Sequence, residues 1–495
     1  MKQYFLTSCP ECQEAKIEEL KKLKQFDTFK EVPDEGQFRI STTWVLWEKN
    51  GAIRARLVAR GYEENCNVRT DSPTVSKSGL RTFLAVAAYK GWIARTTDIK
   101  SAFLQGKPLS RGVYVTPPKE AGSTKGKIWK LNSCLYGLND AARHFYNSVS
   151  EELLRIGCQR SSLDPAIFYS NVNDRLHGLF ICHVDDFLHT GNSEFQNDVV
   201  EPIRKCFTVG RCEESTFDYV GFHLQQTSDG IKVAQNQYVE GIANYDMESS
   251  RRSQKCEKLN PEENKAFRAL VGKLNWAVQG CRPDFAFSVV YLSTKFQSAT
   301  VNDMLQLMKC IKKLKESSSE IFIPHLTSLP NTWSIMVFSD AAHENLTNNI
   351  TSTSGHIIFL VDSDHHSVPL SWCSNKIKRV VRSSLAAEAL SLQSALEDAL
   401  YHQSIIQELL GKQSVPKITA IIDSQSLHDA VNSTKLVNDK RLRIDLGAIK
   451  QSIERKEVDL HWYPGSFQLA NCLTKRGAPS QELLDVIRTG RFPLK

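Results

Sequence analysis

Residues 183–188 read HVDDFL, and their adjacent aspartates, Asp185 and Asp186, stand between the apolar runs LFICHV (179–184) and FLHTG (187–191). Short apolar runs rich in aromatic and β-branched residues predict two strands, so the pair lies at or beside a hairpin turn. Aspartate favours turns through its side-chain hydrogen bonds, and a turn alone explains many such pairs. A bound Mg²⁺ is the other explanation, because carboxylate oxygens are its preferred ligands and the cation cancels their repulsion.

A metal site at this hairpin needs a third ligand from another strand. Asp98 ends a β-rich run and begins the segment DIKSAFLQG (98–106). With Asp185 and Asp186 it would complete the carboxylate cluster with which polymerases hold two Mg²⁺ ions. One ion would lower the pKa of a primer 3′-hydroxyl, and the other would neutralise the triphosphate and the pyrophosphate that leaves.

Three further residues have both a structural and a functional interpretation. Phe103, five residues after Asp98, is either a core residue or a wall against a 2′-hydroxyl that selects deoxynucleotides. Arg54 and Arg56, in the predicted strand RARLVA (54–59), are either surface charges or ligands of an incoming triphosphate.

The bulk composition is that of an ordinary globular protein. At 495 residues the chain is too long for one core, and its 41% hydrophobic and 24% charged content is typical of a soluble protein. A net charge of +7 makes the chain only mildly basic, so any nucleic-acid binding is expected to come from local basic patches. The motif CPEC (9–12) lacks a second pair at zinc spacing, so the cysteines are expected to be reduced, cytosolic thiols. Neither a signal peptide nor a membrane span is predicted.

The first 332 residues alternate between helical and β-rich patterns. A charged amphipathic helix is predicted at 13–30, and further helices at 78–91 and 140–157. The polar stretch 246–265 predicts a loop before a helix at 266–280, and the Ser- and Pro-containing stretch 316–332 predicts a boundary.

After residue 332 the predicted order is strand, strand, strand, helix, strand, helix. This order places Asp340 and Asp423 at the ends of two central strands, and Glu388 on the intervening helix can reach the same point. Three acidic residues so placed would bind two Mg²⁺ ions and activate water against a phosphodiester. A single helical glutamate is weak evidence, since most face solvent.

Seven segments, in this order, resemble the reverse transcriptase of copia-type LTR retrotransposons: RARLVARGY (54–62), DIKSAFLQG (98–106), VYVTPP (113–118), CLYGLNDAARHFY (134–146), HVDDFL (183–188), YVGFHL (219–224) and ALVGKLNWAVQGCRPDFAFSV (269–289). The likeness runs from about residue 15 to 475. It implies that Asp98, Asp185 and Asp186 are catalytic and that Phe103 is the sugar gate. It also implies that Tyr136 and Gly137 lie beside template and nucleotide.

The segments VFSDAA (337–342), RSSLAAEAL (382–390) and IIDSQSL (421–427) are similar to the first three acidic motifs of the RNase H that follows this polymerase. The resemblance therefore implies an α/β, multidomain chain: a right-hand polymerase fold with fingers, palm and thumb, then an RNase H-like domain with a mixed central sheet. The expected segments are fingers and palm at 1–225, a largely helical thumb and connection at 226–330, the RNase H-like domain at 331–476 and a C-terminal tail at 477–495.

The implied activity is RNA-directed DNA polymerisation with linked cleavage of RNA in RNA–DNA hybrids. Its cofactor would be Mg²⁺, two ions per active site, with Mn²⁺ as an alternative. The expected partners are an RNA template, a DNA primer, RNA–DNA hybrid and dNTPs, with integrase or capsid proteins of the same element left open, and no membrane. Binding to the hybrid should be salt-sensitive and weakly sequence-dependent. The implied location is the cytoplasm, with virus-like particles and nuclear entry of the product left open.

Three departures from the family pattern bear on activity. His183 stands where the family has mostly tyrosine, and LYGLNDAARHFY replaces the commoner LYGLKQAPRAWY, which exchanges a proline for Ala142 and introduces Asp140. QLANCLTK (468–475) replaces QLADILTK, so Asn471 takes the place of the fourth carboxylate. Asn471 keeps an oxygen for a metal ion but loses the charge, and hybrid cleavage is expected to be weakened.

Two alternatives remain open at this point. The departures at His183, Ala142 and Asn471 favour a non-catalytic, nucleic-acid-binding relic of a retroelement, or a decayed nuclease domain that only grips the hybrid. All three polymerase aspartates argue against the relic. An ordinary cellular nuclease of the RNase H class does not explain the first 330 residues.

Overall fold

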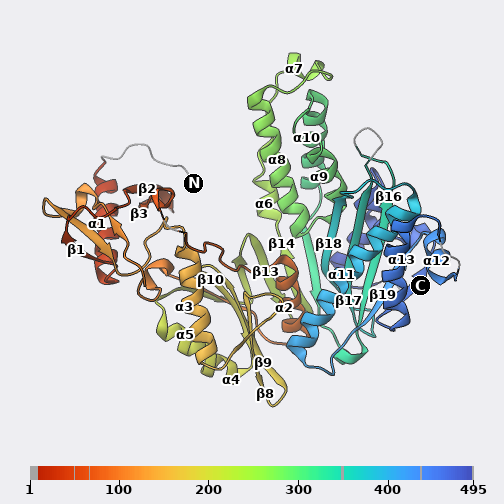
Figure 1. Cartoon of the computed structure of the whole chain (residues 1–495), viewed down its shortest axis with the longest axis horizontal. Helices are drawn as coiled ribbons and strands as arrows, with labels where there is room; N and C mark the ends of the chain where they lie inside the picture. The colour runs from red at the N-terminus through yellow and green to blue at the C-terminus, as the bar shows by residue number, and fades with distance from the viewer. Residues whose placement is uncertain (1–8, 50, 66, 347–350, 435–436, 493–495) are drawn as a thin grey trace. The chain divides into compact units, whose positions relative to one another are not determined.

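The computed structural model of the chain describes residues 9–49, 51–65, 67–346, 351–434 and 437–492 (Figure 1). The chain divides into two compact units. Unit 1 comprises Met1–Val75, Arg95–Asn171 and His177–Glu213, and unit 2 comprises Ser76–Ala94, Val172–Leu176 and Glu214–Lys495. The four segments expected from the sequence stay a prediction, and their outer ends, 1–8 and 493–495, lie outside the described residues.

The main sheet of unit 1 has six strands in the order β11-β4-β10-β9-β8-β7. Its strands are β4 (Arg95–Ile99), β7 (Gln159–Arg160), β8 (Ile167–Val172), β9 (Arg175–His183), β10 (Asp186–Gly191) and β11 (Val209–Glu214). β9 and β10 form the predicted hairpin, in which His183 pairs with Asp186 across a two-residue turn. Val184 in this turn has φ +58°, a left-handed conformation that is rare for a β-branched residue and often marks a functional site.

Aromatic side chains join this sheet to its helices. The helices are α3 (Ala141–Arg155), α4 (Ser193–Phe195) and α5 (Glu201–Cys206). α3 is amphipathic and buries Phe145, whose ring stacks 6.3 Å from that of Phe187 on β10. Phe180 on β9 and Phe207 after α5 complete the same core. α3 ends before Gly157, at φ +102°, as its sequence predicts.

The remaining part of unit 1 is a small helix-and-strand layer. It contains α1 (Pro10–Gln25), a hairpin of β2 (Thr42–Lys49) and β3 (Ala52–Ala59), and a sheet of β1 (Phe29–Pro33), β6 (Lys127–Leu131) and β5 (Tyr114–Val115). The helix predicted at 13–30 begins earlier, because Cys9 caps it and Pro10 occupies its first turn. Cys9 and Cys12 form a disulfide, so the expectation of reduced thiols is wrong for this pair. The other described cysteines are free.

The first part of unit 2 combines one sheet with a group of helices. The sheet has the order β12-β13-β14-β15. Its strands are β12 (Thr216–Tyr219), β13 (Phe222–Thr227), β14 (Gly230–Ala234) and β15 (Glu320–Pro324), and the helices are α2 (Lys77–Lys90), α6 (Asn236–Glu240), α7 (Ser249–Ser253), α8 (Pro261–Gly280), α9 (Ala286–Ser293) and α10 (Val301–Lys315). α8 and α10 lie side by side (Figure 1).

Two boundaries predicted in this part are wrong. The stretch 246–265 contains α7, and α8 begins at Pro261 rather than 266, because Asn260 and Glu263 form a reciprocal capping box. The stretch 316–332 contains β15, whose Ile321 and Ile323 pair with β14. The partner of β15 lies more than eighty residues earlier in the chain, so the local Ser and Pro pattern hid the strand.

The second part of unit 2 is built on a five-stranded mixed sheet in the order β18-β17-β16-β19-β20. The strands are β16 (Ser334–Ala342), β17 (Thr353–Val361), β18 (Ser367–Lys376), β19 (Lys417–Ile422) and β20 (Val458–Trp462), and the helices are α11 (Ser384–Leu410), α12 (Gln425–Asn432), α13 (Lys440–Glu454), α14 (Asn471–Thr474) and α15 (Gln481–Thr489). β16 to β18 are antiparallel, whereas β16, β19 and β20 are parallel.

The long helix α11 packs on β16 and β17 (Figure 1). This arrangement matches the predicted order of elements after residue 332, while α15 lies in the stretch expected as a tail. None of the helices in the described ranges combines the length and apolar composition that a membrane crossing requires.

Candidate functional sites

The β9–β10 turn brings the first set of predicted carboxylates together. β10 pairs antiparallel with β4 so that Asp186 lies opposite Asp98. Directly opposed residues in antiparallel strands point to the same face of the sheet, with Cβ atoms about 5 Å apart. The backbone carbonyl of Asp185 accepts a hydrogen bond from the amide of Ile99 at 2.9 Å, which fixes the turn against β4. The sheet therefore gathers the three aspartates from segments almost ninety residues apart.

The electrostatics of these aspartates reflect their shared, half-buried position. Burial, together with the charges of Asp185 and Asp98, raises the pKa of Asp186 to about 6. Burial is also the main cause of the raised pKa of Asp185, and Asp98 adds to it. A cation bound between these carboxylates would reduce the repulsion between their negative charges.

The oxygen donors of the three aspartates suit Mg²⁺. Among the described residues, however, Asp98, Asp185 and Asp186 are not one of the groups whose ligand atoms all lie within 4.8 Å of one another. A common cation would therefore require side-chain rotation, which the exposed side of the turn permits because all three residues are only partly buried.

Gly210 on β11 lies directly against the carboxylate of Asp98, a contact that the sequence did not reveal. A Cβ atom at this position would lie 2.4 Å from Oδ2 of Asp98, closer than real Cβ contacts come. Only glycine leaves room for the carboxylate as it stands. No local motif marks this residue, since the contact arises from the pairing of β11 with β4.

The substitution Gly210→Ala is expected to slow primer extension by about 10²-fold, because displacement of a reacting group by about 1 Å has that effect. The thermal midpoint should change little, since the side chain that moves is partly exposed. Extension kinetics and a thermal melt of the same preparation check this. Gly272→Ala, in α8 with open space around its Cβ position, is the matched control. Unchanged extension by Gly210→Ala would show that the Asp98 carboxylate reaches its working position with or without the added methyl group.

Three of the five residues predicted to bind a nucleotide line one small cavity. Arg54, Arg56 and Tyr136 line a cavity of about 120 Å³ in unit 1. The guanidinium of Arg56 stacks on Tyr136, with its carbon 4.7 Å from the ring centre. The ring of Phe103 lies 5.4 Å from that of Tyr136. The two arginines are exposed, so their charges face solvent and are available to an anion.

Gly137 is fixed by packing of the backbone. It has φ +89°, and a Cβ atom there would lie 2.2 Å from the carbonyl oxygen of Ala59. The amide of Ala59 donates to the carbonyl of Tyr136 at 2.7 Å, so this turn is closely joined to β3. Glycine is required here for the close approach of two backbone segments, whatever the turn binds.

Two of the family departures have structural partners. Asp140 accepts from Arg111 at 2.8 Å, and Arg111 also pairs with Glu64 at 2.8 Å. The acidic residue therefore belongs to an ion-pair network within unit 1. His183 forms an isolated antiparallel β-bridge with Thr74, and burial lowers the pKa of its imidazole although the charge of Asp185 opposes this shift.

The second set of predicted carboxylates forms a closer cluster. Asp340 lies near the end of β16 and Asp423 follows β19, and these strands are parallel neighbours. Glu388 comes from the second turn of α11, which packs on β16. One oxygen of each of these three residues lies within 4.8 Å of the others. Three hard oxygen donors at this spacing fit a divalent cation such as Mg²⁺.

Burial raises the pKa values of two carboxyl groups in this cluster. Burial and the charges of Asp340 and Asp423 raise the pKa of Glu388 from its ordinary 4.5 to about 9. Burial and Asp340 also raise the pKa of Asp423. Without a cation, Glu388 is therefore protonated at neutral pH, and a cation that binds here must displace its proton.

The pKa of Glu388 predicts that metal-free protein loses stability as the pH rises from 6 to 9. The folded state holds a proton that the unfolded state releases above pH 4.5, so the free energy of unfolding falls by at most about 1.4 kcal/mol per pH unit. Thermal melts in EDTA across this range measure the slope. Glu388→Gln, which stays neutral, should flatten it, whereas Glu397→Gln on the exposed face of α11 should not. Equal slopes in all three proteins would contradict the raised pKa.

Asn471, the fourth predicted ligand, is already hydrogen-bonded within the protein. Its Oδ1 accepts from Nζ of Lys475 at 2.7 Å, and its Nδ2 donates to the carbonyl of Gly465 at 2.8 Å. Nζ of Lys475 also lies 3.0 Å from Oδ1 of Asp340. Thr474 donates to the other oxygen of Asp340. Thr474 and Lys475 were within the quoted motif, but no rule of spacing singled them out.

A second acidic group in the described residues is a structural turn. Asp362, Asp364 and His366 have ligand atoms within 4.8 Å of one another. Oδ1 of Asp362 accepts from the amides of Asp364 and His366, and Oδ2 accepts from Thr327 and from the His366 ring. These bonds account for both oxygens of Asp362 without a metal.

The comparisons with known proteins agree with this arrangement. Residues 26–253 match the family model described as reverse transcriptase (RNA-dependent DNA polymerase). The Retrovirus-related Pol polyprotein from transposon RE1 of Arabidopsis thaliana is 26% identical over 460 residues, which cover 88% of this chain and 30% of that protein. The corresponding polyprotein from transposon TNT 1-94 of Nicotiana tabacum is 23% identical and covers 92% of this chain and 36% of that protein. The chain thus spans about a third of the length of these relatives.

A solved structure is similar over most of the chain. A foamy viral protease-reverse transcriptase in complex with double-stranded DNA covers 94% of this chain and 71% of its own, with a TM-score of 0.55 and 14% identity. At this identity the likeness shows the fold. It confirms the expected class, a right-hand polymerase fold followed by an RNase H-like domain with a mixed sheet. The family match and the retrotransposon relatives support the expected resemblance to a copia-type retrotransposon reverse transcriptase.

Proposed function

We propose that the chain is an RNA-directed DNA polymerase that adds nucleotides from dNTPs to a primer on an RNA or DNA template. The observation that carries this proposal is the register of β4 and β10, which sets Asp98 opposite Asp186 beside the turn that contains Asp185. The family match over residues 26–253 supports it, because these aspartates lie inside the matched range.

In this proposal each group around the site has one task. Asp98, Asp185 and Asp186 hold Mg²⁺, or Mn²⁺ in its place. Ions bound there would neutralise charge on the triphosphate and lower the pKa of the primer 3′-hydroxyl. Arg54 and Arg56 bind the triphosphate, since an exposed guanidinium matches phosphate oxygens in pairs.

The direct test is extension of a primed RNA template with dNTPs and Mg²⁺. The parent protein should extend the primer, and the Asp185→Asn protein should not. Failure of the parent protein, with the template still bound, would favour the alternative of a non-catalytic, nucleic-acid-binding relic. The family likeness would then reflect ancestry alone.

We further propose that unit 2 cleaves the RNA strand of RNA–DNA hybrids. The cluster of Asp340, Glu388 and Asp423 on a mixed sheet supports this proposal. These residues would hold the cation that activates a water molecule against the phosphodiester. A labelled hybrid should be cleaved by the parent protein and remain intact with Asp423→Asn. The rate of an Asn471→Asp protein, compared with the parent, measures what the missing carboxylate costs.

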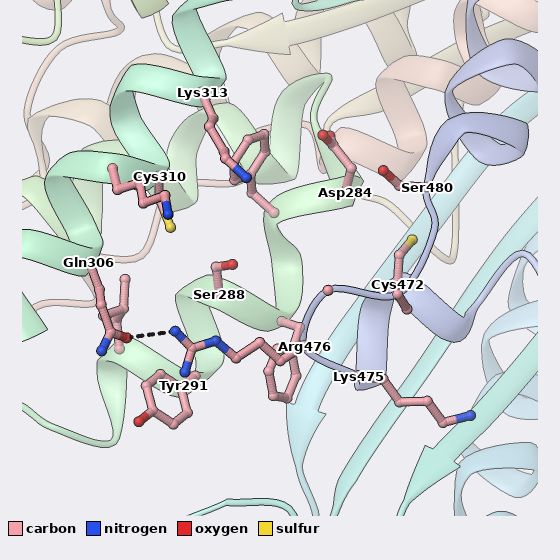
Figure 2. Close-up of a pocket in the computed structure, with 16 residues that line it drawn as sticks. Asp284, Ser288, Tyr291, Gln306, Cys310, Lys313, Cys472, Lys475, Arg476 and Ser480 are labelled. Carbon is pink, nitrogen blue, oxygen red and sulfur yellow. Dashed lines mark hydrogen bonds between the residues drawn. The ribbon is translucent and has the colours of Figure 1, made fainter.

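A basic pocket beside the second cluster supports binding of the hybrid. It has a volume of about 460 Å³ and lies between α9, α10 and the segment after α14. Figure 2 shows Lys313 extending into it from α10 and Arg476 reaching across to Gln306. The guanidinium carbon of Arg476 is 5.6 Å from the ring centre of Tyr291. Cations next to an aromatic ring are typical of surfaces that follow a nucleic-acid backbone.

Removal of Lys313 and Arg476 is expected to weaken hybrid binding and reduce its dependence on salt. Each lost phosphate contact lowers the slope of log K against log salt by about 0.9, so the double alanine variant should lose about 1.8. Fluorescence anisotropy with a labelled hybrid in EDTA measures this slope. Lys412→Ala with Arg175→Ala, an exposed pair outside the pocket, removes the same charge and should have little effect. Equal slopes in the two double variants would exclude the pocket from the path of the hybrid.

A further inference from the structure

The second carboxylate cluster contains a positive charge of its own. Nζ of Lys475 lies 3.0 Å from Oδ1 of Asp340 and 2.7 Å from Oδ1 of Asn471. Asp340 is fully buried, whereas 44% of the Lys475 side chain is exposed. The ammonium group therefore lies between Asp340 and position 471, where the family pattern has an aspartate in addition to this lysine.

Both oxygens of Asp340 are occupied by this segment. Oδ1 accepts from Lys475, and Oδ2 accepts from the hydroxyl of Thr474. These two hydrogen bonds take up the acceptor sites of Asp340 that face the 471–475 segment, and its remaining acceptor sites stay available to an ion shared with Glu388 and Asp423. Among the described residues, neither Asp423 nor Glu388 shares a hydrogen bond with the 471–475 segment.

Asn471 suits this arrangement better than an aspartate would. Its amide nitrogen donates to the carbonyl of Gly465, and its oxygen accepts from Lys475. An ionised carboxylate has no hydrogen to donate, so it would face the Gly465 carbonyl unpaired. Gly465 in turn lies against Asp423, whose Oδ2 is 3.0 Å from the position of a Cβ atom there. Asn471 thus connects the lysine to the loop that borders the third carboxylate.

The backbone of Lys475 is held at the end of α14, and its side chain and that of the next residue point in different directions. Its amide donates to the carbonyl of Asn471 at 3.0 Å, at the end of α14. Figure 2 shows that the next residue, Arg476, points into the basic pocket, whereas the amino group of Lys475 points away from it. Arg476 is therefore directed into the basic pocket and Lys475 toward the carboxylate cluster, and of these two residues only Lys475 contacts a carboxylate of the cluster.

We propose that Lys475 is a built-in cation that takes the place of a second metal ion, so that the nuclease cluster binds one divalent cation. This inference rests on the proposed hybrid cleavage by the same cluster. A second ion between Asp340 and residue 471 would have to bind both oxygens at about 2.1 Å. The ammonium already occupies that position and repels a divalent cation, while the neutral amide of Asn471 offers no charge to compete with it.

The number of bound ions is the test, with Mn²⁺ alone as the probe. Electron paramagnetic resonance of free Mn²⁺ gives the stoichiometry for the full chain, and the polymerase aspartates contribute equally to every variant. The parent protein and Asn471→Asp should bind the same number, because Lys475 still fills the position. Asn471→Asp combined with Lys475→Met should bind one more. Lys417→Met, an exposed lysine at the far end of β19, should leave the number unchanged.

Three results would decide against the proposal. A gain of one ion by Asn471→Asp alone would show that Lys475 is no barrier, and this variant retains every other side chain if the double variant folds poorly. No gain by a folded double variant would show that no second position exists. A parent count that does not fall with Asp423→Asn would overturn the proposed nuclease site as well, which separates the two failures.

Discussion

The substitution Asp98→Asn is expected to lower the rate of primer extension by about 10³-fold, since a metal-held charge contributes several kcal/mol to the transition state and each 1.4 kcal/mol is tenfold. Asp98 is placed opposite Asp186 by the register of β4 and β10, so its charge adds directly to that of the turn. Asparagine keeps the size of the side chain. The loss should therefore appear in the rate constant for extension and not in the stability of the fold.

Steady-state extension on a primed RNA template measures this loss. Asp174→Asn is the matched control, because Asp174 is exposed in the β8–β9 turn with φ +58°, a conformation that asparagine also accepts. A reduction of less than tenfold by Asp98→Asn would mean that the cation is held by Asp185 and Asp186 without the third strand.

The largest effect on stability is expected from Arg81→Met. Arg81 is fully buried on α2 and donates to the carbonyls of Gln279 and Gly280 at 2.6 and 2.8 Å and of Leu370 at 3.3 Å. The first two carbonyls lie at the end of α8, where a helix has no partners of its own for them. The guanidinium carbon also lies 3.7 Å from the ring centre of Trp372. Loss of these contacts should cost about 3–4 kcal/mol.

Thermal denaturation should show this cost as a midpoint about 5–10 °C lower in the transition of unit 2. Arg81→Lys should recover only part of the loss, because a single ammonium cannot reach three carbonyls in the geometry of a guanidinium. Arg175→Met, at an exposed turn, controls for loss of charge. A midpoint within 2 °C of the parent protein would show that solvent replaces Arg81 at the end of α8.

Where the local pattern carries the information, the sequence was a sound guide. The apolar runs around 183–188 predicted the β9–β10 hairpin, and the strand ends at Asp340 and Asp423 predicted a shared point that Glu388 reaches. In both cases an acidic residue at a strand end was enough to predict the site, because the pairing of neighbouring strands brings their ends together. The fold class followed from the order of the motifs and was confirmed by the comparisons.

What escaped prediction depends on contacts between distant segments. β15 is a strand because β14 pairs with it, and Gly210 matters because β11 lies beside β4. Lys475 is part of the second cluster because α14 ends where β16 carries Asp340. The periodicity and composition of a short stretch of sequence do not reveal contacts with distant segments. The roles given to Arg54, Arg56, Tyr136 and Phe103 stay predictions, although the first three line one cavity and the ring of Phe103 contacts Tyr136.

Helix α2 belongs to the first ninety residues, yet it is part of the unit that carries the nuclease-like sheet. Through Arg81 it completes the end of α8 and the edge of β18. If two retroelements exchanged their C-terminal halves, α2 of one parent would therefore have to pack against the α8 carbonyls of the other parent. Recombinants should fold only where these contacts are compatible, so the two proposed activities are expected to be inherited together.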